Sequence, residues 1–369
     1  MHNLAFNSTD YKNLFTHFYE QKHIPTWYNV HTIKEYNLLE RSGSVLAIID
    51  SLINLTNDRF ENRYISQYFH LESMRKAMYE DVPKTILNDL SHTVKRKFPA
   101  YAKKYKNALT KISEPLNLNK NKQVVFISKI GDILNSFFEA KIENKLGNHS
   151  LEIENVIKNV NMRFLEAQEL IDDKDFSNEI LKSATILITG DNTQYNTIIE
   201  NTFKQKNIKR WSRKLVINKF NLLEHSARVA CLVDIFLQVF KDKNYFTKTQ
   251  ELNIFRYALY HDYTEVIFND MNSPVKKIFP ELAESLKSIE KIIMTDELKL
   301  SDSKVAKLIC KIADIYDCKY EANAEKEAGN TNNEYQKVID QYNENYENHE
   351  SKFESISEDI KNDLRTLYF

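Results

Sequence analysis

The chain has 369 residues, a length that allows two or three domains. Its 51 Lys and Arg residues nearly balance 52 Asp and Glu residues, for a formal net charge of −1. This balance excludes the basic field of a nucleic-acid-binding protein, so no stable nucleic acid binding is expected. Three cysteines without paired spacing exclude a disulfide framework, and no apolar run is long enough to span a membrane, so we expect a cytoplasmic protein.

Helical periodicity dominates the chain. Gly (5) and Pro (6) are scarce, and apolar residues recur at helical spacing through most of the sequence. The best strand candidate is the ATILIT run at 184–189, but its position just before Gly190 favours a helix end followed by a linker. The sequence therefore predicts an all-α protein.

Three blocks of the first half recur in the second half in the same order. The matched pairs are 21–42 with 205–226, 77–99 with 258–280, and 127–148 with 309–330. The repeat is about the size of one domain, longer than the repeats of solenoid proteins. We therefore predict a tandem duplication with domains 1–190 and 191–369.

Two predicted helices of the second half carry histidines. The apolar stripe of 224–239 begins at His225, which alone is more simply explained as a core histidine. The helix that ends in IFRYALYHD carries His261 and Asp262, and its continuation would carry Glu265 on the same stripe as His261. Burying an imidazole and a carboxylate together costs free energy unless a group such as a metal ion binds them. These residues therefore indicate a site.

A third predicted helix, 302–323, contributes Asp314. On a helical wheel Asp314 lies opposite the apolar stripe, so periodicity alone predicts a solvated carboxylate. With His225, His261 and Asp262 it would complete a set of two imidazoles and two carboxylates. Such a set suits a divalent ion of the Mn, Co, Fe or Mg kind with open water positions, more than a closed structural zinc site.

The first copy has lost the histidines but keeps the packing residues around them. Arg41, Glu80 and Lys84 stand at the positions of His225, His261 and Glu265, whereas Trp27, Asp81, Asp89 and Asp132 match Trp211, Asp262, Asp270 and Asp314. Buried charges without partners would be costly, so the differences indicate the decay of a metal site. One alternative stays open: Arg41, Glu80 and Lys84 form an ion-pair network in the place of the metal ion.

The second half carries an ordered set of motifs, which are, in chain order, Arg210-Trp211, Glu224-His225-Ser226, His261-Asp262 with Glu265, Asn269-Asp270, Pro274-Val275-Lys276 and Ala313-Asp314. This set resembles the motifs of the HD-domain phosphohydrolases, and most of all those of the bacterial YfbR-like 5′-deoxynucleotidases. The chain departs from the family in having Asn269 where Gly is usual, Ser273 in the PTPVK-like run, and a second, degenerate copy. Because family members commonly pair as homodimers, the two copies are expected to form a pseudo-dimer within one chain.

The resemblance implies a role for each matched residue. His225, His261, Asp262 and Asp314 would hold the metal ion, Glu265 would orient or deprotonate the attacking water, Arg210 would hold the phosphate, and Trp211, Asp270 and Lys276 would contact the substrate.

These roles predict a metal-dependent phosphohydrolase that removes the 5′-phosphate of (deoxy)nucleoside monophosphates by attack of a metal-bound water. Two other enzymes remain open on the same site, a dNTP triphosphohydrolase and a cyclic-nucleotide phosphodiesterase. A third alternative is a nucleotide-sensing binding protein in which the first copy is regulatory.

Overall fold

Helices and the loops between them make up the part of the chain that the structure describes. This computed structural model describes residues 11–27, 30–59, 65–88, 90, 92–211, 214–268 and 280–341. Within these ranges there is no strand, only two isolated bridges, Pro25 with Asn37 and Lys209 with Asn221. The all-α prediction is therefore confirmed. None of the described helices is both long and apolar enough to cross a membrane.

The chain divides into two compact units, Met1–Ile199 and Glu200–Phe369. The ATILIT run forms the end of α10 (Lys174–Thr189), as expected, and the helix stops at Gly190, whose φ of 85° lies in the left-handed region. The next helix, α11 (Thr193–Gln205), contains the division point. The predicted boundary near residue 190 thus lies in the turn between two helices, and the assignment of two domains stays a prediction.

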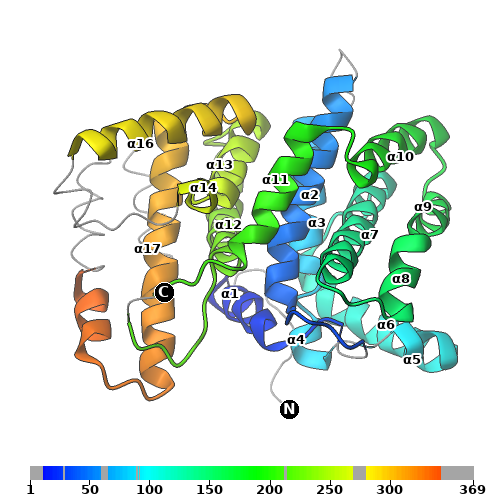
Figure 1. The fold of residues 1–369 in the computed structure, drawn as a ribbon, viewed down its shortest axis with the longest axis horizontal. Coiled ribbons are helices and arrows are strands. Elements are labelled where there is room, and N and C mark those ends of the chain that lie inside the picture. Colours follow the sequence, from blue (N-terminus) through cyan, green and yellow to red (C-terminus); the bar gives the residue numbers. More distant parts are fainter. Residues whose placement is uncertain are drawn as a thin grey trace. The chain divides into compact units, whose positions relative to one another are not determined.

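Three helices in mutual contact form the centre of the first unit: α2 (Leu38–Arg59), α3 (Gln67–Glu80) and α7 (Lys122–Lys145) (Figure 1). Helix α7 approaches α2 closely at Gly131, where an added Cβ would lie 2.5 Å from Ile49 Cγ1. The other helices of this unit are α1 (Tyr11–Glu20), η1 (Gln21–His23), α4 (Lys84–Leu87), α5 (His92–Lys97), α6 (Pro99–Ser113), η2 (Glu114–Leu116), α8 (Leu151–Lys158) and α9 (Val160–Gln168).

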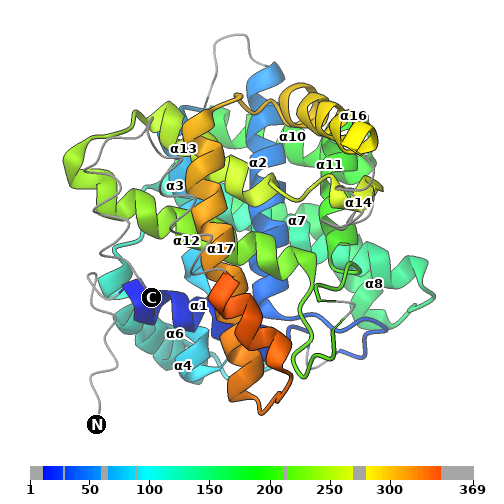
Figure 2. The same cartoon turned by 90° about the vertical axis from the view of Figure 1, so that its left-hand side faces the viewer.

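The second unit has a corresponding centre, in which α12 (Leu222–Phe240), α13 (Lys248–Tyr260) and α17 (Lys304–Glu327) contact one another (Figure 2). A capping box fixes the start of α12, because Asn221 and Glu224 each accept the other's backbone N–H. The remaining named helices are η3 (Lys241–Lys243), α14 (Glu265–Phe268), α16 (Pro280–Ile292) and the π-helical η4 (Ile293–Glu297).

Corresponding contacts join the same elements in both units. A tryptophan with positive φ donates its Nε1 proton to a buried glutamate at 2.7 Å in each unit, Trp27 to Glu139 and Trp211 to Glu321. One turn later on the same helix, a second glutamate, Glu143 or Glu325, accepts two consecutive backbone N–H groups. These belong to the loop before α2 in the first unit and to the loop before α12 in the second. These matches support the predicted duplication, and the pseudo-dimer stays a prediction.

Candidate metal centre

The two predicted histidine ligands direct the same ring atom toward one point. His225 is fully buried in the first turn of α12, and its Nδ1 lies 2.6 Å from Asp317 Oδ2. A carboxylate only accepts, so Nδ1 donates, and Nε2 of the neutral ring presents a lone pair. His261 likewise donates from Nδ1 to the Ala258 carbonyl at 2.8 Å, which leaves its Nε2 as an acceptor.

Four acceptor atoms converge at this point. The Nε2 atoms of His225 and His261 lie 3.1 Å apart. Asp262 Oδ2 lies 3.1 Å from His261 Nε2 and 3.4 Å from His225 Nε2, and Asp314 Oδ1 lies 3.4 Å from His225 Nε2. Lone pairs this close repel unless a cation or a proton lies among them. Two imidazoles with outer hydrogen bonds and two carboxylates are a donor set that fits a divalent metal ion.

The pKa values of His225 and Asp314 are shifted in the directions that favour a positive charge among these residues. Burial and the charge of Arg210 act to lower the pKa of His225, but hydrogen bonds with Asp262, Asp314 and Asp317 raise it to about 10. Burial also opposes ionisation of Asp314, yet its hydrogen bond with His225 holds the pKa of this carboxyl well below the usual range. A metal ion would supply the positive charge in place of the proton.

The prediction of one continuous helix through His261 and Glu265 is wrong. Helix α13 ends at Tyr260, a turn follows, and α14 begins at Glu265, whose backbone N–H donates to the Asp262 carbonyl at 3.0 Å. Consecutive side chains of a helix diverge by about 100°. The turn instead allows His261 and Asp262 to lie within reach of the same atom.

Asp314 is not the solvated carboxylate that helical periodicity alone predicts. Its side chain is only 17% exposed; Oδ1 faces His225, and Oδ2 pairs with Lys311 Nζ at 2.6 Å. The helical-wheel prediction fails because α17 contacts both α12 and α13, so that the position opposite its main apolar stripe still faces protein. Periodicity separates buried from solvated positions only where a helix packs on one side.

Arg210 lies at the edge of the cluster, in the loop before α12. Its Nη1 is 3.9 Å from Asp262 Oδ2, Nε donates to Glu321 at 3.1 Å, and Nη2 donates to Cys318 Sγ at 3.0 Å. The side chain is 16% exposed. The structure thus brings a guanidinium beside the predicted ligands, as binding of a phosphate near a metal ion requires.

Trp211 shares the anchor of Arg210. Its Nε1 donates to Glu321 at 2.7 Å, and its ring centroid lies 5.9 Å from that of Tyr335. The indole is therefore held next to the guanidinium. The other two predicted substrate contacts, Asp270 and Lys276, lie outside the described residues.

Sequence reasoning missed the buried ion pairs behind His225. Asp317, Arg228 and Glu321 are all fully buried. Arg228 donates from Nε and Nη2 to Asp317 at 2.6 and 2.9 Å, and from Nη2 also to Glu321. Although His225, Asp317 and Glu321 have acidic and imidazole atoms close enough for a second metal site, Arg228 already supplies the cation there.

The repeat contained a signal for this pair. The match of 127–148 with 309–330 places Asn135 opposite Asp317, and an ungapped extension of the match of 21–42 with 205–226 places Ser44 opposite Arg228. Both charges are therefore absent from the copy that lacks His225. The two polar residues still contact each other, because Ser44 Oγ donates to Asn135 Oδ1 at 2.6 Å. Comparing the charged positions of the two copies would have marked Asp317 and Arg228 from the sequence, although it would not have shown that they contact each other.

A guanidinium takes the corresponding position in the first unit. Arg41 forms an ion pair with Asp132 through Nη2, and its Nε lies 3.7 Å from Asp81. Lys84 Nζ lies 2.7 Å from Asp81 as well. Glu80 accepts a hydrogen bond from a serine of α7 at 3.3 Å. Arg41 and Lys84 thus pair with the retained carboxylates, which supports the ion-pair alternative for these two residues.

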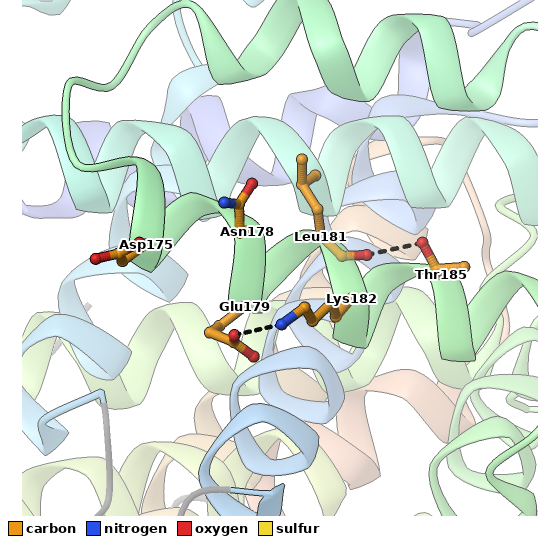
Figure 3. Close-up of a pocket in the computed structure, with 6 residues that line it drawn as sticks. All are labelled: Asp175, Asn178, Glu179, Leu181, Lys182 and Thr185. Carbon is orange, nitrogen blue, oxygen red and sulfur yellow. Dashed lines mark hydrogen bonds and ion pairs between the residues drawn. The ribbon is translucent and has the colours of Figure 1, made fainter.

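A surface hollow on α10 is lined by residues of a different kind from those of the candidate metal centre. A cavity of about 380 Å³ on α10 is lined by six residues of this one helix, shown in Figure 3: Asp175, Asn178, Glu179, Leu181, Lys182 and Thr185. Glu179 and Lys182 pair with each other at 2.7 Å. The lining has neither an imidazole nor a thiol, and we assign it no function.

Part of the second unit is similar to a known protein family. Residues 198–301 match the family model described as 5′-deoxynucleotidase YfbR-like. This segment resembles the YfbR-like enzymes. The resemblance predicted from the sequence is confirmed over this part of the chain, which includes Arg210, His225, His261 and Asp262, whereas Asp314 lies beyond it.

Similar curated proteins carry the same description. A 5′-deoxynucleotidase of Vibrio cholerae is 36% identical over 87 residues, 24% of this chain and 44% of that protein. One of Pasteurella multocida is 37% identical over 83 residues, 22% of this chain and 42% of that protein. One of Enterobacter is 28% identical over 116 residues, 31% of this chain and 58% of that protein. The chain thus spans about half the length of these relatives, and no solved structure matches it.

Proposed function

We propose that the second unit is a metal-dependent phosphohydrolase that removes the 5′-phosphate of nucleoside monophosphates. The observation that carries the proposal is the convergence of two imidazole Nε2 atoms and two carboxylates beside the guanidinium of Arg210. The similarity of residues 198–301 to YfbR-like 5′-deoxynucleotidases supports a 5′-nucleotide as substrate, with deoxynucleotides as the first to test.

In this proposal, His225, His261, Asp262 and Asp314 hold a divalent ion of the Mn, Co, Fe or Mg kind. When bound, such an ion polarises a phosphoryl oxygen and lowers the pKa of a coordinated water. The ligand residues are already oriented for it, since the outer ring nitrogen of each histidine is hydrogen-bonded.

The remaining residues bind the substrate and move a proton. Arg210 neutralises charge on the phosphate oxygens, and Glu321 holds its Nε in place. Glu265, which begins α14 directly after the ligand turn, accepts the proton of the attacking water. The bond from phosphorus to the nucleoside oxygen breaks, and that oxygen takes up a proton. Trp211, Asp270 and Lys276 complete the proposed substrate contacts.

The test is phosphate release from a panel of deoxy- and ribonucleoside monophosphates, triphosphates and cyclic nucleotides with Mn²⁺ or Co²⁺. We expect inorganic phosphate from 5′-monophosphates with the wild-type chain and none with Glu265→Ala. Tripolyphosphate from a triphosphate, or a linear nucleotide from a cyclic one, would replace the proposal with one of the two alternative hydrolases. Absence of turnover on every substrate would contradict an enzymatic function.

A second candidate function belongs to the first unit, which we propose also binds a nucleotide without hydrolysing it. A cavity of about 450 Å³ there is lined by residues that include Trp27, His31 and Tyr36. Trp27 is the counterpart of Trp211, which favours a ligand of the same class. Equilibrium dialysis would count the nucleotides bound per chain: we expect two, with one lost in Trp27→Ala and the other in Trp211→Ala. A single site that Trp27→Ala leaves intact would refute this function.

A further inference from the structure

The residues behind His225 form a continuous buried chain of charges. Asp317 accepts from His225 Nδ1 at 2.6 Å and is also bound by two nitrogens of Arg228. Arg228 continues to Glu321, which accepts from both Arg210 and Trp211. The chain therefore runs from a predicted metal ligand to two of the predicted substrate contacts, Arg210 and Trp211. All of its inner members are fully buried.

Burying this many charges is costly and does not by itself stabilise a fold. Well-packed hydrophobic residues of similar volume often make a protein as stable as a buried ion pair does, or more so. At the same positions the first unit has an uncharged pair, in which Ser44 donates to Asn135 in the corresponding place between α2 and α7. The charges of Asp317 and Arg228 therefore have a purpose other than holding these helices together.

This uncharged pair occurs in the copy that has no counterpart of His225. At this position the first unit has Arg41 in place of His225, so there is no imidazole Nδ1–H here for a carboxylate to accept. In the second unit, Asp317 accepts that proton, so that Nε2, which faces His261, Asp262 and Asp314, is the ring nitrogen left to bind a metal ion. A neutral amide in place of Asp317 would bind the ring proton more weakly and would give the ring less electron density.

We propose that Asp317 and Arg228 form a positioning pair, in which Asp317 fixes the orientation and proton position of His225 for metal binding and Arg228 supplies the countercharge that Asp317 needs in the protein interior. This proposal rests on the proposed metal site. Neither residue contacts the substrate or the metal ion. Their effect reaches the reaction only through His225.

The test gives the second unit the two uncharged residues that the first unit has at these positions. Asp317→Asn alone would leave Arg228 buried without its main countercharge, and loss of folding would then explain any result. The double variant Asp317→Asn/Arg228→Ser removes both charges and reproduces the neutral pair that the first unit tolerates. We expect it to fold, with unchanged far-ultraviolet circular dichroism, and to bind Mn²⁺ about 10- to 100-fold more weakly by calorimetry. The Co²⁺ absorption spectrum should also change, because the His225 ring is no longer fixed.

Glu325→Gln is the matched control. Glu325 is a fully buried carboxylate on the same helix, but it accepts from the Ile217 and Asn218 amides and does not contact the chain of charges. We expect this variant to bind Mn²⁺ as the wild type does. Equal Mn²⁺ affinity in the wild type and the folded double variant would overturn the positioning role alone. Absence of Mn²⁺ and Co²⁺ binding in the wild type would overturn the proposed metal site with it.

Discussion

At the proposed metal site, metal binding at His225 would compete with a proton. A metal ion requires a neutral imidazole. Burial and Arg210 disfavour the protonated ring, but its hydrogen bonds with three carboxylates prevail and raise the pKa of His225 to about 10 in the metal-free protein. At any pH between 7 and 9 the ring is therefore protonated before a metal ion arrives. Binding of Mn²⁺ should release about one proton from it.

The size of the effect follows from that competition. The dissociation constant for Mn²⁺ should fall about tenfold per pH unit, or about 1.4 kcal/mol, throughout the range from pH 7 to 8.5. An imidazole with the ordinary pKa of about 6.5 would give a constant that levels off near pH 7.5. Calorimetric titration in buffers with different heats of ionisation measures both the affinity and the protons released. A pH-independent dissociation constant over this range, with no proton released, would refute the reasoning.

Four further changes test other parts of the structure. His261→Ala should lose the metal ion, and unchanged metal content by elemental analysis would contradict the ligand assignment. Glu265→Ala should lose turnover but keep the metal ion; loss of both would argue against its role as base. Arg41→Ala removes ion pairs with Asp81 and Asp132 and should lower the free energy of unfolding of the first unit by about 1–3 kcal/mol in urea titrations, whereas bound metal should not change. In the metal-free protein the raised pKa of His225 stabilises the fold fully below about pH 6.5, so the thermal midpoint should fall as the pH rises toward 10; a constant midpoint would contradict that pKa.

Helical periodicity and the internal repeat carried most of what the sequence could predict. Scarce glycine and proline gave the helical class, and the match between the halves singled out His225 and His261 because the first copy has Arg41 and Glu80 instead. Such a comparison is informative because a substitution that changes charge but not packing is typical of a site and not of a core.

The rest depended on tertiary contacts that a single-helix pattern does not contain. Asp314 faces protein because α17 has neighbours on more than one side. The end of α13 at Tyr260 depends on a local turn that no glycine or proline marks. Asp317 and Arg228 lie among apolar residues of their helices and are distant in sequence, so only the fold shows that they meet.

The positive charge of the Arg41 guanidinium, unlike that of a bound metal ion, does not have to be taken up from the surroundings. The guanidinium is covalently part of the polypeptide, so it can neither dissociate into the surroundings nor be removed by a chelator. The charge balance around Asp81 and Asp132 is therefore complete as soon as the first unit folds. Around Asp262 and Asp314, the proposed metal ion would have to come from the surroundings. A shortage of metal would then affect one half of the chain and leave the other unchanged.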